Sequence, residues 1–193
     1  HEVSYYPGEV TLRMADAVVI NKIDSADYKD IITVRENIRR VNQNATVIDA
    51  ASTLTVDDIS AIRGKRVLVV EDGPTLTHGE MKIGAGVVAA QRFGAVELVD
   101  PRPYAVGKLK KTFQIYPGIG TVLPAMGYGD EQIKDLAATI DACECDSVII
   151  ATPIDLKRVI KINKPCVKVE YQLQEIGKPD LEMVIGDFIK KIK

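Results

Sequence analysis

"KRVLVVEDG", residues 65–73, predicts a buried strand that ends in two acidic side chains and a glycine. Its apolar residues are consecutive rather than alternating, which indicates that both faces of the strand are buried. Strands of this kind are typical of a parallel sheet that helices cover on both faces. The stretch therefore predicts the centre of an α/β fold.

Strand and helix patterns alternate on both sides of this stretch. Further strand patterns occupy 16–21, 45–50, 95–100, 146–152 and 166–173. Helix patterns occupy 28–42, 55–64, 86–94, 130–142, 153–161 and the residues from about 180 onward. This alternation predicts an α/β fold with a mostly parallel sheet and helices on both faces. Because a helix pattern ends at Gly64 before the strongest strand, we predict two domains, 1–64 and 65–193.

The composition is that of an ordinary globular chain. Its 193 residues are 46% hydrophobic and carry a formal net charge of -2, which argues against a nucleic-acid partner. No run approaches the roughly 18 apolar residues that a membrane helix needs, so we expect no membrane partner and a cytoplasmic location. Three cysteines without Cys/His pairs at zinc spacing predict reduced thiols and no metal site. A homo-oligomer stays open.

The segment "DAVVINKIDSAD" places Asn21, Lys22 and Asp24 directly after an apolar strand pattern. Ligands of parallel sheets bind beyond the carboxyl ends of the strands. There, the Asp24 carboxylate can accept two hydrogen bonds from guanine, Asn21 can reach the other base edge, and the Lys22 stem can lie over the ring. "VIDAAST", which contains Ser52, follows the next strand, where a second base-binding loop is expected. We predict that these four residues bind a nucleotide. A plain strand end with turn-forming residues is the open alternative.

The phosphate loop of GTPases, G-x-x-x-x-G-K-[ST], does not occur in the sequence. "GEMKIGAG", residues 79–86, has the glycine spacing but lacks the Lys-Ser/Thr pair. The chain also begins at His1 without a methionine. Together these features predict a C-terminal piece of a longer protein, which does not hydrolyse ATP or GTP by itself.

A Gly-rich connection over residues 72–86 joins the central strand to a helix pattern. Backbone N–H groups and the helix dipole favour an anion at such a place. A rigid, proline-flanked loop follows the next strand pattern. In these two loops we predict substrate or phosphate binding by Thr75, Thr77, Gly79, Gly84, Gly86 and Arg102. The predicted catalytic side chains are His78, Lys82 and Asp72, since His1 and His78 are the only imidazoles in the sequence.

Two other interpretations of this connection stay open. "GAGVVA", residues 84–89, fits the dinucleotide pattern G-x-G-x-x-A, and Asp100 ends the next strand pattern like a ribose-binding acid. However, its glycines begin more than ten residues after the strand, whereas an NAD fingerprint lies in the turn itself. The glycines could equally serve a purely structural helix start.

Several strings resemble one known family. "EDGPTLTHGEMKIGAG", "VDPRPYAVGKLKKTF" and "YPGIGTVLPAMGYG" are similar to segments of the archaeal cyclic 2,3-diphosphoglycerate synthetase-like family, whose members are also described as predicted GTPases. The resemblance covers nearly the whole chain and concerns the C-terminal part of the family. It implies a P-loop NTPase-like first part, a Rossmann-like second part, and a phosphate loop upstream of His1.

The resemblance also implies chemistry. Founding members use ATP to close an intramolecular phosphoanhydride in 2,3-diphosphoglycerate, so the expected partner is a small phosphorylated metabolite and the expected cofactor is ATP or GTP with Mg²⁺. The Asn-Lys-x-Asp string favours guanine, whereas the synthetase reaction implies ATP, and both stay open. A GTP-binding regulatory switch without metabolic chemistry is a further alternative.

Overall fold

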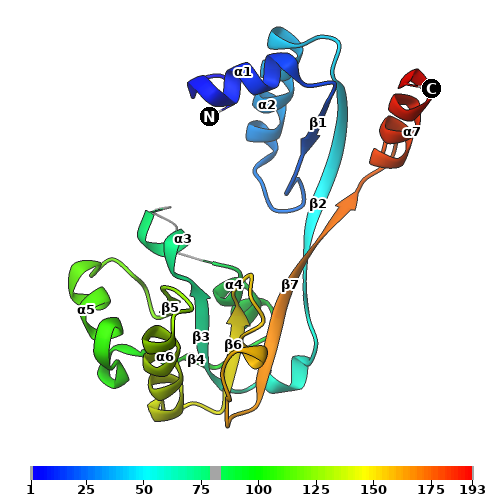
Figure 1. Ribbon diagram of the computed structural model, residues 1–193. Coiled ribbons are helices and arrows are strands. Elements are labelled where there is room, and N and C mark those ends of the chain that lie inside the picture. Colours follow the sequence, from blue (N-terminus) through cyan, green and yellow to red (C-terminus); the bar gives the residue numbers. More distant parts are fainter. Residues whose placement is uncertain (1, 79–83, 193) are drawn as a thin grey trace. The chain divides into compact units, whose positions relative to one another are not determined.

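The computed structural model describes residues 2–78 and 84–192 (Figure 1). Its strands are β1 (Ala17–Ile20), β2 (Thr46–Val56), β3 (Arg66–Asp72), β4 (Glu97–Leu98), β5 (Leu123–Ala125), β6 (Ser147–Ala151) and β7 (Cys166–Glu175). They form a mostly parallel, seven-stranded sheet in the order β1-β2-β7-β6-β3-β4, with β5 also paired to β3. The predicted α/β fold is confirmed.

The helices fall close to most of the predicted helix patterns. They are α1 (Tyr6–Met14), α2 (Tyr28–Val41), α3 (Gly73–His78), α4 (Ala85–Arg92), α5 (Gly107–Ile115), α6 (Asp130–Ala142) and α7 (Leu181–Ile192). Short 3-10 turns lie at Ile59–Ala61, Arg102–Tyr104 and Leu156–Arg158.

The chain divides into two compact units. The first contains residues 1–53 and 171–193, and the second contains residues 54–170. Strands β2 and β7 run through both units. The domain boundary predicted at Gly64 stays a prediction, because contacts in a folded chain do not show which segments fold independently.

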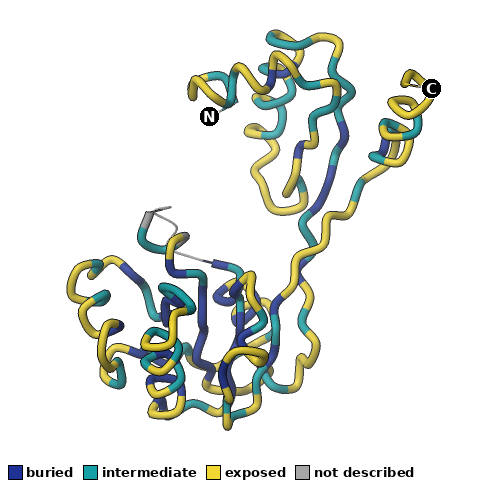
Figure 2. The backbone as a smooth tube through the Cα atoms, viewed as in Figure 1, coloured by how far each residue is buried: buried dark blue, intermediate teal, exposed yellow. Residues whose placement is uncertain are grey.

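The second unit is a three-layer α/β structure whose central strand is β3. Alternate side chains of β3 enter two separate cores: Val67 and Val69 pack in the core that contains α4, whereas Leu68 and Val70 pack in the core that contains α5 and α6. All four side chains are fully buried, as the dark strand in Figure 2 shows. Continuous burial on both faces explains why the sequence of this strand is apolar without alternation.

The first unit is smaller and more open. Val18 of β1 pairs in parallel with Val47 of β2. The Ile176 N–H donates to the Asp49 carbonyl at 2.8 Å, and the Thr53 hydroxyl donates to the Gln172 carbonyl at 3.2 Å, so residue numbers rise along β2 where they fall along β7. This pair is therefore antiparallel. Among the described residues of the unit, the buried apolar cluster consists of Leu12, Ile20 and Ile38.

Several segments differ from the sequence prediction. The helix predicted over 153–161 is wrong, because only the 3-10 turn Leu156–Arg158 forms there. The helix predicted over 55–64 is wrong: β2 continues to Val56 and only a 3-10 turn follows. The strand continues because Leu54 is buried in the core of the second unit and Val56 packs against it. Helix α5 was not predicted, because it lies in a stretch that prolines and glycines punctuate. Its first residue, Gly107, has φ +53, and a side chain there would overlap the Asp135 carboxylate.

Candidate active site

The second unit has a topological switch point beside β3. The chain passes from β3 through α4 to β4 on one side, and β6 pairs with β3 on the other side. In open α/β sheets, ligands bind in the crevice outside the carboxyl ends of the strands at such a point. The polar residues at these strand ends are Asp72, the last residue of β3, Thr152 directly after β6, and Tyr128 in the loop after β5. We call these strand ends and their loops the β3–β6 crevice.

Glu71 lies next to Asp72 at the end of β3. Its side chain is only 5% exposed, and one carboxylate oxygen accepts hydrogen bonds from the N–H groups of Gly86 at 2.8 Å and Val87 at 3.3 Å. The pKa of Glu71 is raised to about 7, because the effect of burial, with a smaller contribution from the charge of Asp72, outweighs the two N–H donors that lower it. This carboxyl can therefore gain or lose a proton near neutral pH.

Two glycines allow α4 to begin against β3 at this point. A side chain on Gly84 would overlap the Glu71 carboxylate, and a Cβ on Gly86 would lie 2.5 Å from Val69 Cγ1. The N–H of Gly86 is already donated to Glu71. Substrate binding by Gly84 and Gly86 stays a prediction, and an anion could take the Gly86 N–H only by displacing Glu71.

Three polar side chains, those of Asp72, Tyr128 and Thr152, lie near one another at these strand ends. Burial raises the pKa of Tyr128, the charge of Asp72 raises it further, and Thr152 lowers it. The Tyr128 hydroxyl is buried and has no well-formed hydrogen bond within the part of the chain that the structure describes. Thr152 is 4% exposed and donates to the Ile154 carbonyl at 2.6 Å. The Tyr128 hydroxyl is thus the group best prepared to bond to a ligand.

The remaining residues predicted for this loop fall into two groups. Thr77 is described, and its hydroxyl donates to the Gly73 carbonyl at 3.1 Å within α3. Thr75 and His78 lie in α3, but their side chains are outside the description, and Gly79 and Lys82 lie outside the described residues. Their predicted roles stay predictions.

Arg102 lies in the 3-10 turn that follows β4. Its guanidinium donates to the Ile119 carbonyl at 2.7 Å and to the Gly120 carbonyl at 3.2 Å, and it lies 3.4 Å from the Asp100 carboxylate. These contacts join two loops of the second unit. Substrate binding by Arg102 stays a prediction, and a substrate would compete with these backbone carbonyls.

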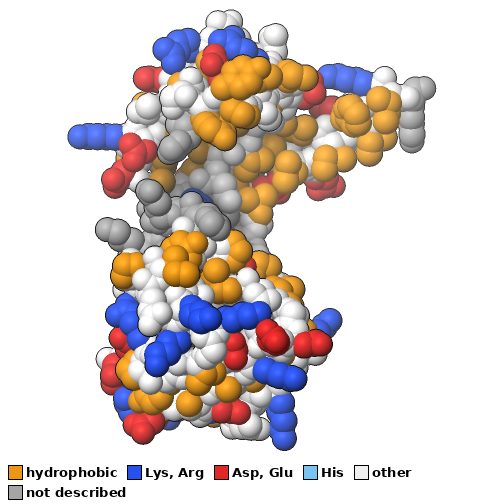
Figure 3. Space-filling model, turned by 60° about the vertical axis from the view of Figure 1, so that its left-hand side comes forward, with side chains coloured by type: hydrophobic (Ala, Val, Ile, Leu, Met, Phe, Trp, Pro, Cys, Tyr) orange, Lys and Arg blue, Asp and Glu red, His pale blue; other side chains and the backbone are white. Residues whose placement is uncertain are grey.

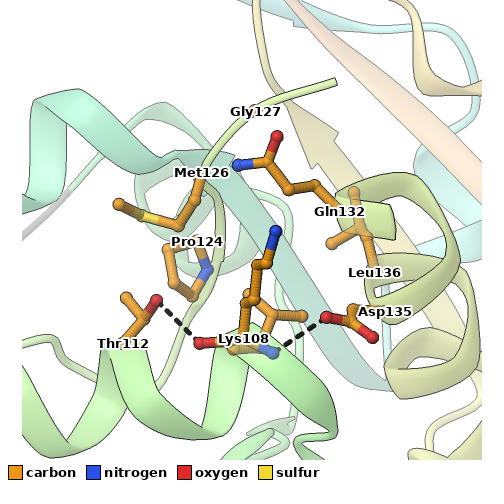
Figure 4. A pocket seen from close by; sticks show the side chains of 9 residues that line it. Lys108, Thr112, Pro124, Met126, Gly127, Gln132, Asp135 and Leu136 are labelled. Atoms are coloured by element: carbon orange, nitrogen blue, oxygen red, sulfur yellow. Dashed lines mark hydrogen bonds between the residues drawn. The ribbon is translucent and has the colours of Figure 1, made fainter. Parts of the chain in front are cut away.

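A recess opens between α5, α6 and the loop after β5 (Figure 4). The Lys108 side chain extends between Pro124 and Met126 on one side and Gln132 and Leu136 on the other. The recess has a volume of about 20 Å³, which is close to that of one water molecule. The recess therefore cannot hold a substrate by itself.

The four residues predicted to bind a nucleotide lie in the first unit. Asp24 accepts a hydrogen bond from the Ser52 N–H at 3.3 Å, and Asn21 accepts one from the Lys22 N–H at 2.8 Å. Lys22 has φ 63, a left-handed conformation that turns the chain sharply after β1. The segments 21–24 and 47–53, which we predicted to form one nucleotide site, are thus adjacent. Their base-binding role stays a prediction.

The described residues contain neither a cluster suited to a metal ion nor a membrane-spanning helix. No group of three or more His, Cys, Asp or Glu side chains in residues 2–78 and 84–192 is arranged to hold a metal ion. None of the helices in those residues has the length and apolar character needed to cross a membrane.

Comparison with known proteins adds a relative. No protein-family model matches the chain. Over 190 residues, or 98% of its length, the chain is 57% identical to "Arginine synthetase ArcE" of Thermococcus kodakarensis. The chain is similar to an arginine synthetase. It spans 42% of the length of that synthetase.

Two polar residues at these strand ends, Thr152 and Tyr128, were not predicted from the sequence. Thr152 is the first polar residue after the apolar strand "SVIIA", and Tyr128 stands between glycines in "MGYGD". Thr152 carried a signal, because it is the polar residue that ends the predicted strand 146–152, whereas Tyr128 followed no predicted strand. Only β5, which is three residues long, made the position of Tyr128 meaningful, and so short a strand is hard to predict.

Proposed function

We propose that this chain contributes the substrate site of a nucleotide-dependent synthetase, and that the site is the β3–β6 crevice. The observation that carries the proposal is the 57% identity to an arginine synthetase over 98% of the chain. The switch point, where strand ends bring Glu71, Asp72, Tyr128 and Thr152 together, supports this choice of site.

The charge of the described crevice favours an arginine-related substrate over a bisphosphate. Asp72 and Glu71 are both acids, and an ionised carboxylate attracts a guanidinium or ammonium group and repels phosphate. Cyclisation of 2,3-diphosphoglycerate, which the family resemblance implies, would bring several negative charges to the same place. It remains the second candidate, because the strings "EDGPTLTHGEMKIGAG" and "YPGIGTVLPAMGYG" support it.

The roles of the described side chains follow from their positions. Tyr128 donates a hydrogen bond to the reacting part of the substrate, and Asp72 holds its cationic part. Glu71, with a pKa of about 7, fixes the start of α4 beneath them and stores or releases a proton. Closing the crevice to water would strengthen each of these interactions.

The nucleotide is assigned only in part. Asn21, Lys22, Asp24 and Ser52 fit a base edge, because two polar side chains and a backbone N–H lie together there. The sequence lacks the loop that would hold a triphosphate with Mg²⁺, so we route no phosphoryl-transfer step through these residues. ATP and GTP are both retained. If Asp24 reads guanine, Asp24→Asn should shift binding toward xanthine nucleotides.

The test uses the natural-length protein that carries this chain. Run in reverse, the proposed synthetase breaks the bond of arginine that it forms in the forward direction and releases the two precursors. The water consumed in that cleavage comes from joining labelled phosphate to ADP or GDP with Mg²⁺, so arginine should drive incorporation of the label into ATP or GTP. Lysine is the matched control amino acid. A parallel assay supplies 2,3-diphosphoglycerate and ATP and measures the cyclic product. Arginine-dependent exchange supports the proposal, whereas cyclic product without it supports the second candidate.

A further inference from the structure

The second unit contains a separate cavity that is larger than the recess at Lys108. It lies where the end of β2, the start of β7 and the turn after β6 meet, and its volume is about 390 Å³. Pockets for small molecules typically have roughly 300–1,000 Å³. Its charged lining consists of Asp57, Asp155, Lys157, Arg158, Lys168 and Glu170. We call it the β2–β7 cavity.

The cavity is lined by equal numbers of cationic and acidic side chains, which form weak ion pairs with one another. Lys157 lies 3.2 Å from Asp57, Lys168 lies 2.9 Å from Glu170, and Arg158 lies 3.6 Å from Asp155. These side chains are partly exposed, and exposed ion pairs contribute only about 0–1 kcal/mol each. A ligand that brings both signs of charge can therefore replace such pairs at little cost. Arg158 is the most available cation, since 85% of its side chain is exposed.

Two of the carboxylates are held in place by the backbone. One oxygen of Asp57 accepts the Lys168 N–H at 3.0 Å, and one oxygen of Asp155 accepts the Lys157 N–H at 3.1 Å. Groups that are positioned before a ligand arrives lose less conformational freedom on binding. The cavity thus has prearranged acids beside adjustable lysine and arginine side chains.

We propose that the β2–β7 cavity binds a neutral, zwitterionic α-amino acid. Lys157 and Arg158 would bind its carboxylate, and Asp155 and Glu170 would bind its ammonium group. A simple anion would satisfy the cations and leave the acids facing an uncompensated charge, and a simple cation would do the reverse. Only a ligand with both groups matches a lining of three cations and three acids.

The cavity also has a covalent connection to the crevice. The turn that carries Asp155, Lys157 and Arg158 begins at Thr152, whose hydroxyl bonds to the Ile154 carbonyl within the same turn. An amino acid in the cavity therefore contacts the segment that also presents Thr152 to the crevice. The binding proposal itself does not rest on the proposed synthetase activity.

Isothermal titration calorimetry of the chain with three probes tests the proposal without any nucleotide. The probes are norleucine, which is a zwitterion, hexanoate, which keeps only the acid, and pentylamine, which keeps only the amine. We expect norleucine to bind at least tenfold more tightly than either of the others. Equal binding of all three probes, or no binding of norleucine, would overturn the proposal.

Variants locate the binding. Lys157→Met and Glu170→Gln should each weaken norleucine binding about tenfold, whereas Lys161→Met, an exposed lysine outside the cavity, should not change it. Circular dichroism checks that each variant is folded. Equal losses in Lys157→Met and Lys161→Met would show that the amino acid binds elsewhere, and having two cavity variants keeps the test decisive if one is unstable.

Discussion

Two strand ends in this molecule carry similar sequences but lie in different surroundings. "DAVVINKID" ends β1 in the first unit, and "KRVLVVED" ends β3 in the second. After β1, Asn21, Lys22 and Asp24 are exposed. Near the end of β3, Glu71 is 5% exposed and has a pKa raised to about 7.

The difference comes from what covers each strand. β3 lies between two large cores, so its terminal carboxyl is buried and its chemistry changes. β1 belongs to a unit with a small buried cluster, and hydrophobic side chains remain exposed on α7 of the same unit (Figure 3). These exposed residues are Met183, Ile185, Phe188, Ile189 and Ile192. Polar residues after a strand thus acquire unusual properties only where the packing around them is complete.

The largest expected effect compares the two cores directly. Ile149→Ala, at a fully buried position of β6, should lower the free energy of unfolding by about 3–5 kcal/mol, because it leaves a cavity that cannot relax. Ile20→Ala, at the end of β1, should cost about 2 kcal/mol, because its small cluster can collapse. Urea unfolding measures both values. Equal losses would show that the two units are packed equally well.

The pH dependence of stability sharpens the comparison at Glu71. Its folded pKa is raised from 4.5 to about 7, so its contribution is fully present below pH 4.5 and is lost as the pH rises through 7. Relative to Glu71→Gln, the native protein should lose about 3 kcal/mol of unfolding free energy over this range. Denaturant unfolding at several pH values measures this difference. A constant difference between pH 4.5 and 8 would mean that Glu71 is ionised in the folded protein throughout.

Close packing around the start of α4 predicts a smaller loss. Gly86→Ala would place a methyl group 2.5 Å from Val69 Cγ1 and 3.0 Å from Ala151 Cβ, so overpacking should cost about 1–3 kcal/mol. Gly118→Ala is the matched control, because no atom lies within 4 Å of the added methyl group. Thermal unfolding compares the two variants. Similar melting temperatures would show that α4 can move away from the sheet.

The smallest expected effect belongs to the end of β1. Asp24→Ala removes the hydrogen bond to the Ser52 N–H, but both groups can bond to water instead, so the loss should be about 0.5 kcal/mol. Urea unfolding of this variant provides the measurement. A loss of several kcal/mol would give Asp24 a structural role and weaken its proposed role in reading a base.

The fold was largely accessible from the sequence, whereas the site was accessible only in part. Consecutive apolar residues such as Val67–Val70 predicted a buried parallel strand, because that pattern depends on local sequence. The crevice depends on the order of strands, which places Thr152 and Tyr128 beside Asp72 although they are distant in sequence. Likewise, only the structure shows that Glu71 already uses the Gly86 N–H that seemed open to a phosphate.

The most direct test of the β3–β6 crevice is arginine-dependent phosphate exchange by the natural-length protein. Asp72→Asn and Tyr128→Phe should each reduce the rate at least 100-fold, at unchanged melting temperature, because in the proposed site Tyr128 bonds to the reacting part of the substrate and Asp72 holds its cationic part. Tyr5→Phe, at an exposed position just before α1, is the matched control and should keep the native rate. Native rates in both crevice variants, together with active native protein, would contradict the assignment of the active site to this crevice.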